Sequence, residues 1–272
     1  MGTETSGFEF WESSFCHNKE GATATATSGA VTAAYVLTHR LTAKWLSVGS
    51  VNGDNEVLTI TLPQAKECTV LHVSKHNITD ILAEVEVGGS WQTLTGETVT
   101  LIDGSKASYY LFDALNVSKV RVSGANTTDG GEKYIQRVIL SKRIGRIREH
   151  IAGTGHNVTK PTMSLNYNEI THRNLAGRGF FQRGEGLANI NLAITVTSEQ
   201  HNVDIVKGLY SRDSFLVWPS GATAPVYHKV KTPMFEWDAV YKMAVTGSMD
   251  NNHYKNLFGS GAVYTMSFLE LA

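Results

Sequence analysis

Two histidines have a spacing that can bind a metal ion. His72 and His76 are four residues apart, and on a helix this spacing brings two imidazoles to one zinc ion. Here the surrounding segment, Cys68–Ser74, alternates in the way that is typical of a strand. Positions four apart on a strand lie about 13 Å from each other, which is too far for one ion. The sequence therefore favours a structural or surface role for both histidines and predicts no metal site.

An oxygen-rich turn is a second candidate for binding a cation. Asn52, Asp54 and Glu56 carry side-chain oxygens of the kind that calcium prefers. Their spacing does not match an EF-hand loop, and turns closed by Asn or Asp side chains use the same residue types without any ion. We expect a plain turn here and no cofactor anywhere in the chain.

A glycine-rich basic loop, Gly177–Gly186, is the best candidate for a contact surface. It leads into an expected strand at Ile190–Thr197 and so lacks the helix N-terminus that makes such loops bind phosphate. Arginine and phenylalanine are common anchors of protein interfaces. We predict an interface role for this loop, with an ordinary hairpin carrying exposed arginines as the open alternative. The residues concerned are Arg178, Phe180, Phe181 and Arg183.

The sequence offers little for catalysis. Ser260 lies between two glycines, but it lacks the strand–turn–helix context of a nucleophile elbow. Glu236 and Asp238 share one face of an expected strand about 7 Å apart, and paired carboxylates suit glycoside hydrolysis. A solvated strand face explains the same pair. We therefore predict no catalytic residues and a protein that is not an enzyme.

Composition narrows the class of protein further. The chain has 272 residues, of which 18% are charged, and a net charge of −1, which argues against a dedicated nucleic-acid-binding protein. Cys16 and Cys68 allow at most one disulfide, and the sequence does not decide whether they pair. No signal peptide and no apolar stretch long enough to span a membrane is visible. We expect synthesis in the cytoplasm.

The elements that would position these residues are mostly strands. Runs of Thr, Val, Ile and aromatic residues alternate with polar ones and are separated by Gly, Asn and Asp turns, which is typical of a β-sandwich or jelly roll. About eight strands are expected before residue 145. The expected runs are Val57–Leu62, Cys68–Ser74, Ala83–Val87, Trp91–Leu94, Tyr109–Phe112, Lys119–Ser123 and Tyr134–Leu140.

A domain boundary is predicted near residues 145–160. The basic stretch Arg137–Arg148 reads as the last strand of a first domain, and a glycine-rich stretch follows it. The prediction is a β-sandwich over residues 1–145, with an N-terminal arm, and a β-rich domain over 146–272. A capping pattern before an apolar series at helical spacing predicts one helix near 199–209. The clearest strand of this half is expected at Phe235–Val245, and the last at Val263–Leu271.

The order of features up to residue 145 resembles the discoidin-like, or galactose-binding-like, β-sandwiches. The resemblance is carried by the turn Asn52–Asp54 and by the strand that begins after the turn at Gly89 and continues Trp-x-x-Leu over Trp91–Leu94. It implies the sandwich fold, but the ligand-binding loops of that family vary, so no binding residue is transferred. The arginine usual before the late strand pair is replaced by Tyr109 and Tyr110, which weakens an inference of ligand binding.

The plan of the whole chain, over residues 30–272, resembles tail and baseplate proteins of bacteriophages. One strand of the expected sandwich ends in the sequence His-Asn-Ile, which begins at His76. The chain then leaves the sandwich through a basic segment at Ile139–Gly145, and a β-rich part with one capped helix follows. This resemblance implies a structural virion component, assembled in the host cytoplasm from copies of itself and other tail proteins. Nucleic acid and membrane are not expected partners. The alternative is a carbohydrate-binding module, for which Trp45 and Trp91 are the available aromatic residues, although both fit a core role.

Overall fold

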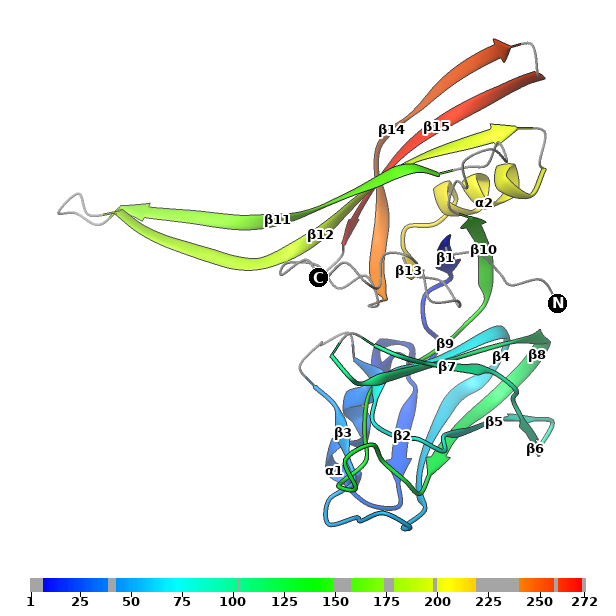
Figure 1. The fold of residues 1–272 in the computed structure, drawn as a ribbon, viewed down its shortest axis with the longest axis vertical. Coiled ribbons are helices and arrows are strands. Elements are labelled where there is room, and N and C mark those ends of the chain that lie inside the picture. Colours follow the sequence, from blue (N-terminus) through cyan, green and yellow to red (C-terminus); the bar gives the residue numbers. More distant parts are fainter. Residues whose placement is uncertain are drawn as a thin grey trace. The chain divides into compact units, whose positions relative to one another are not determined.

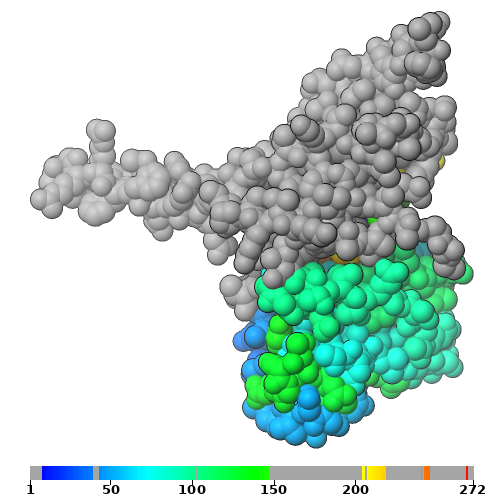
Figure 2. All heavy atoms as spheres, in the orientation of Figure 1, coloured from blue at the N-terminus to red at the C-terminus, as the bar shows by residue number. Residues whose placement is uncertain are grey.

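The computed structural model describes residues 7–38, 43–101, 103–148, 158–173, 179–197, 200–218, 240–256 and 259–270. The chain forms two compact units, of which one contains Trp11–Arg143 and the other Met1–Phe10 together with Ile144–Ala272. Side chains are described mainly for residues up to 146, the coloured spheres of Figure 2. No helix within the described ranges is long and apolar enough to cross a membrane.

The first unit is an antiparallel β-sandwich. Its strands follow the order β3-β9-β4-β8-β5-β6, with β2 paired to β4 and β7 paired to β8 (Figure 1). The predicted fold class, mainly β with an N-terminal β-sandwich, is confirmed. Short helical turns (η1 Asn18–Glu20, α1 Ala30–Ala33 and η2 Ala34–Leu37) precede most of the strands. The strands are β2 Thr23–Ala26, β3 Trp45–Leu46, β4 Glu56–His76, β5 Leu82–Val87, β6 Ser90–Thr93, β7 Glu97–Thr100, β8 Lys106–Gly124 and β9 Tyr134–Ser141.

Two long bent strands connect the two halves of this sandwich. The sequence predicted two separate strands within each of β4 and β8. The structure corrects this prediction, because each of the two runs without a break and four predicted strands become two. The pairing of β4 with β8 shifts register between Thr61 and Lys66 and again after Cys68, so both strands bend together. Bulges of this kind increase local twist and let one strand serve two packed layers.

The core of the sandwich is built from the inward positions of these strands. Between Glu56 and Leu62 of β4, every second side chain is buried, as the alternation predicted. Trp45 is fully buried, and its indole Nε1 donates a hydrogen bond to the carbonyl of Ser28 at 3.0 Å. Gly29 beside it has a φ of +62°, and a Cβ there would lie 1.8 Å from the carbonyl oxygen of Leu46. This turn therefore requires glycine.

Within the described residues, the second unit contains a seven-stranded sheet and one helix. The strands follow the order β10-β1-β13-β14-β15-β12-β11. Helix α2, Gln200–Tyr210, confirms the helix predicted near 199–209, and it buries Ile205 and Leu209, which are one helical turn apart. The strands are β1 Gly7–Trp11, β10 Arg143–Arg148, β11 Val158–Arg173, β12 Gly179–Thr197, β13 Phe215–Trp218, β14 Tyr241–Asn256 and β15 Gly259–Glu270.

The N-terminal arm corrects the predicted division of the chain. The sequence assigned it to the sandwich, whereas β1 lies between β10 and β13 in the sheet of the second unit. Its Phe10 packs against Phe215 and Phe268, with ring centroids 6.1 and 6.0 Å away, respectively. On β1 the buried Glu9 lies 3.7 Å from the guanidinium of Arg146, which is also buried. The sandwich is thus inserted between two neighbouring strands, β1 and β10.

Candidate functional site

The outer face of the sheet β2-β4-β8-β5-β6 carries a regular set of mainly polar side chains. Two rows of directly paired residues cross all five strands. Side chains of directly paired residues project from the same side of a sheet, so each row lies on one surface. The first row is Thr25, Thr59, Arg121, Glu84 and Thr93, and the second is Thr23, Thr61, Lys119, Glu86 and Trp91. We call these ten residues the outer face.

The charged side chains of the outer face are paired with one another. Arg121 Nε lies 2.7 Å from an oxygen of Glu84, and Lys119 Nζ lies 2.9 Å from Glu86. Hydrogen bonds from Lys119 and Ser118 lower the pKa of Glu86 below its usual range. The Arg121 guanidinium also lies 4.3 Å from the ring centroid of Trp91, close enough for a cation–π contact. Trp91 is half-buried on the edge strand β6, so of the two expected core tryptophans only Trp45 belongs to the core.

The sequence showed the alternation of these residues but not their assembly. Thr23 and Thr25, Glu84 and Glu86, and Lys119 and Arg121 each flank one apolar residue, which indicates one polar face per strand. Which strands lie side by side is decided by long-range register, and local spacing carries no information on it. The rows were therefore missed as a site.

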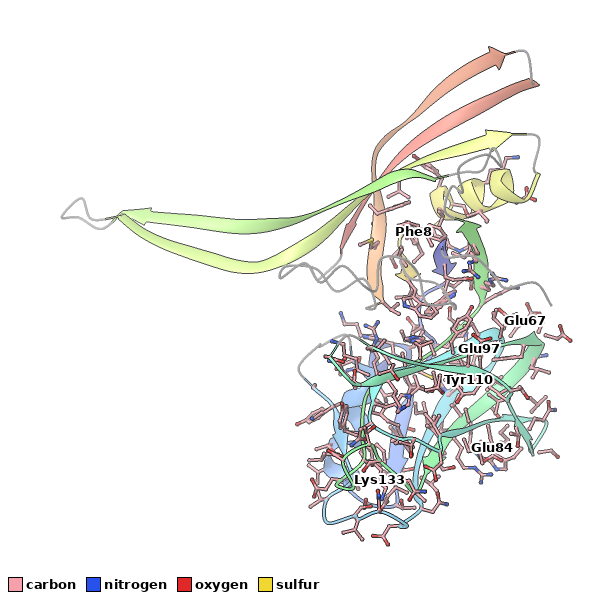
Figure 3. The ribbon with its side chains drawn as sticks, in the orientation of Figure 1. Phe8, Glu67, Glu84, Glu97, Tyr110 and Lys133 are labelled. Carbon is pink, nitrogen blue, oxygen red and sulfur yellow. The ribbon has the colours of Figure 1, made fainter. Side chains whose placement is uncertain are left out.

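A buried lysine organises the loops at one end of the sandwich. Lys133 is fully buried, and its ammonium donates to Ser50 Oγ at 2.7 Å and to the carbonyl of Val51. Its backbone N–H donates to Ser47 Oγ at 2.7 Å. Figure 3 shows Lys133 at a different part of the sandwich from Glu84 of the outer face. The loop 47–51 is consequently held by one internal cation.

The neighbouring loops close around Asn77 and Asp80. Asn77 Nδ2 donates to the carbonyl of Glu132 at 2.8 Å, and its Oδ1 accepts from the N–H of Tyr134. Asp80 accepts from the N–H groups of Ala125 and Asn126, and these bonds lower the pKa of its carboxyl. The polar groups of this end are therefore used to hold loops together.

The predicted cation turn takes part in the same bonding. Asn52 Oδ1 accepts from the N–H of Thr127 at 2.9 Å, and Asp54 accepts from the N–H of Val51 at 3.0 Å. Glu56 is buried and accepts from Thr27 Oγ1 at 2.5 Å. Within the described residues, no three His, Cys, Asp or Glu side chains gather in a way that could hold a metal ion. The interpretation as a plain turn agrees with these contacts.

His72 and His76 are both buried in the sandwich. Desolvation lowers the pKa of each imidazole to about 3, and the nearby cations Arg137 and Lys106, respectively, act in the same direction. His76 Nε2 shares a hydrogen bond of 2.9 Å with Ser108 Oγ. The His72 ring packs against Trp11, with centroids 5.5 Å apart. Their role is structural, as the sequence favoured, and neither is a surface residue.

The predicted interface loop falls at the far end of a long ribbon. Phe180, Phe181 and Arg183 lie on β12, where they pair with His172, Thr171 and Glu169, respectively, of β11. Arg178 lies outside the described residues, as do Glu236 and Asp238. The interface role of the loop stays a prediction. Cys16 and Cys68 are both free and buried, so the structure contains no disulfide between them.

Comparison with known proteins finds likenesses among solved structures only. No protein-family model matches the chain, and no curated protein matches it. A family 32 carbohydrate-binding module of Clostridium perfringens NanJ, solved with galactose, is 15% identical. That match covers 48% of this chain and 98% of the module, with a TM-score of 0.40.

Two further domains give similar values. An F5/8 type C domain from Bacteroides fragilis is 14% identical over 49% of this chain and 97% of its own length, with a TM-score of 0.40. Chitosan-binding module 1 of a Paenibacillus chitosanase/glucanase is 19% identical over 48% of this chain and 98% of its own length, with a TM-score of 0.39. About half of this chain is thus similar to domains of these kinds.

Proposed function

We propose that this chain is a non-catalytic structural protein that assembles with copies of itself, as the tail and baseplate proteins of bacteriophages do. The observation that carries the proposal is the pairing of β11 and β12. Residues 189–194 of β12 lie between two partners, β15 on one side and β11 on the other. Residues 179–188 pair with β11 alone, so here the two strands form a ribbon without a third strand among the described residues (Figure 1).

Such a ribbon needs a partner. An isolated pair of strands is marginally stable in water, and a third strand or a packing surface is what stabilises it. The ribbon begins where Leu165 pairs with Ala188 and runs to the pair of Arg173 with Gly179. Over this stretch, no strand in the described part of the chain pairs with the outer edge of either strand. An unpaired strand edge is a template for pairing with another chain. A neighbouring copy supplies both the missing strand and the packing surface.

The edge of β11 is protected at one end only. β11 is the last strand of the sheet, and Lys160 and Pro161 lie at its base, within an irregularity of register. Lysine and proline are residues with which proteins block edge pairing. The remaining stretch, 162–173, has only Glu169 and Arg173 as charged residues and carries no lysine and no further proline. We infer that the distal edge is the part that is left available for assembly.

The test removes the ribbon and keeps the sheet. Residues 166–187 are replaced by Asn-Gly, because Leu165 and Ala188 face each other and a two-residue turn closes such a pair. Sedimentation and negative-stain microscopy over a wide concentration range should show assemblies for the unaltered chain and monomers for the shortened one. Unchanged circular dichroism and thermal melting of the shortened chain provide the control. A monomeric unaltered chain, or equal assembly of both, would refute the proposal.

The order of elements in the sequence is our reason for proposing the virion tail as the particle in which this chain assembles. The other tail proteins are then further partners.

A second function, carbohydrate binding by the sandwich, is favoured by a separate observation. The outer face combines threonine hydroxyls with the half-buried ring of Trp91.

A further inference from the structure

The outer face is a five-stranded platform whose threonine hydroxyls have few hydrogen-bond partners inside the sandwich. Five strands at a spacing of about 4.8 Å give it a width of roughly 19 Å. Thr23 and Thr25 on β2 are exposed, and Thr59 and Thr61 on β4 are half-buried. Within the described part of the chain, no hydrogen bond uses these four hydroxyls. Each can donate one hydrogen bond and accept two, and β-branching restricts its rotation.

Charge limits what such a platform attracts. Its two cations and two carboxylates form the pairs Arg121–Glu84 and Lys119–Glu86, so the formal charges of the face sum to zero. A nucleic acid, an acidic polysaccharide or an anionic membrane gains no net attraction from such a surface. A protein partner normally buries a centre rich in apolar side chains. The outer face offers one aromatic ring in ten residues.

A neutral sugar chain is the class of ligand that fits the outer face once charged ligands and protein partners are set aside. Its hydroxyls donate and accept hydrogen bonds at short intervals, as do the threonine and charged groups of the two rows. The C–H face of a pyranose ring packs on an aromatic ring, and Trp91 supplies such a ring at the edge of the platform. Arg121 contacts the ring of Trp91 and is itself held by Glu84, so the ring and its polar neighbour are positioned before a ligand arrives.

We propose that the outer face is a binding site for a neutral carbohydrate chain lying across β2, β4, β8, β5 and β6. The proposal rests on the second function above, carbohydrate binding by the sandwich, and adds the location and the charge class of the ligand. It places the site on the strands of the sheet and not on the loops that Lys133 holds together.

The experiment uses the full chain and soluble polysaccharides as probes. Affinity electrophoresis in gels containing hydroxyethylcellulose, galactan, glucomannan or, as the charged comparison, polygalacturonate identifies a binder, and titration calorimetry with oligosaccharides of that polymer gives the dissociation constant. We expect binding to a neutral polymer and none to polygalacturonate. Trp91→Ala should weaken binding about tenfold, which corresponds to the loss of one aromatic contact.

Two further variants separate the site from the fold and from the function. Thr59→Val with Thr61→Val keeps side-chain shape and removes two hydroxyls, so it should weaken binding without lowering the melting temperature. Tyr35→Ala removes an aromatic ring that is 45% exposed and lies outside the outer face, and it should bind as the unaltered chain does. Binding that survives both outer-face changes overturns the location but leaves carbohydrate binding standing. Failure to bind any neutral polymer overturns both, and preferential binding of polygalacturonate overturns the charge class.

Discussion

Mild acid should destabilise the sandwich through its two buried histidines. His72 and His76 have exposed fractions of 0% each, and burial lowers the pKa of both from 6.5 to about 3. The folded state therefore keeps both imidazoles neutral at a pH where the unfolded chain protonates them. Stability from this source is complete above the unfolded pKa and falls as the pH decreases from there toward the folded pKa.

The magnitude follows from the two pKa values. Each unit of pH between them removes about 1.4 kcal/mol for each histidine. At about pH 4.5, the loss is about 3 kcal/mol for one histidine and about 5 kcal/mol for both. Single domains have a total stability of about 5–15 kcal/mol, so this loss is large. The carboxyls whose pKa values are lowered, such as Asp80 and Asp129, add losses of the same sign only at lower pH.

Urea unfolding monitored by tryptophan fluorescence at a series of pH values measures this slope. The unaltered chain should lose stability steadily below about pH 6.5. His72→Gln with His76→Gln should be less stable at neutral pH and nearly flat over the same range. His17→Asn is the matched control, since asparagine keeps the acceptor for the N–H of Lys19 and the slope should stay steep. An unaltered chain whose stability is constant down to about pH 4.5 would refute the reasoning.

Three other changes test the packing of the sandwich. Lys133→Met leaves the buried hydroxyl of Ser50 and the partly buried carbonyl of Val51 without their donor, and urea unfolding should show a loss of about 2–3 kcal/mol. Gly29→Ala should prevent folding, as judged by circular dichroism, because the new Cβ would clash with a backbone carbonyl. Gly49→Ala is the comparison, since Gly49 has a φ of +77° but open space around it, and this change should cost only about 1–2 kcal/mol of stability. Burial raises the pKa of the Cys68 thiol to about 12 and that of Cys16 further, so iodoacetamide should label neither thiol in the native chain and both in urea.

The strands of the sandwich were predictable because alternation is local. Every run expected before residue 145 lies within or nearly within an observed strand, and the helix at Gln200–Tyr210 follows from its own spacing. The merger of runs into β4 and β8 was not predictable. The residues between the two halves of β4, around Pro63, look like a turn, and only pairing with β8 shows that they form a bend.

The strand β1 was missed although its sequence held a usable pattern. Phe8 and Phe10 alternate with Glu9, which is the period of a half-buried strand. The pattern is short and lies next to a polar N-terminus, so it does not stand out in the sequence. The partners of β1, which are β10 and β13, lie more than 100 residues further along the chain. The outer face was missed for the same reason, since its two rows exist only after five strands from separate parts of the sequence have paired.

The insertion of the sandwich between β1 and β10 has a consequence for how such a protein can change. The chain enters the sandwich from β1 and returns from it to β10, and these two strands are neighbours in one sheet. The two ends of the inserted unit therefore join the sheet side by side. Domains whose termini lie close together are exchanged or deleted with little disturbance to their host. A chain in which Phe10 is joined to Ile144 through a short turn should keep its seven-stranded sheet. The same sheet can therefore accept unrelated domains at this position.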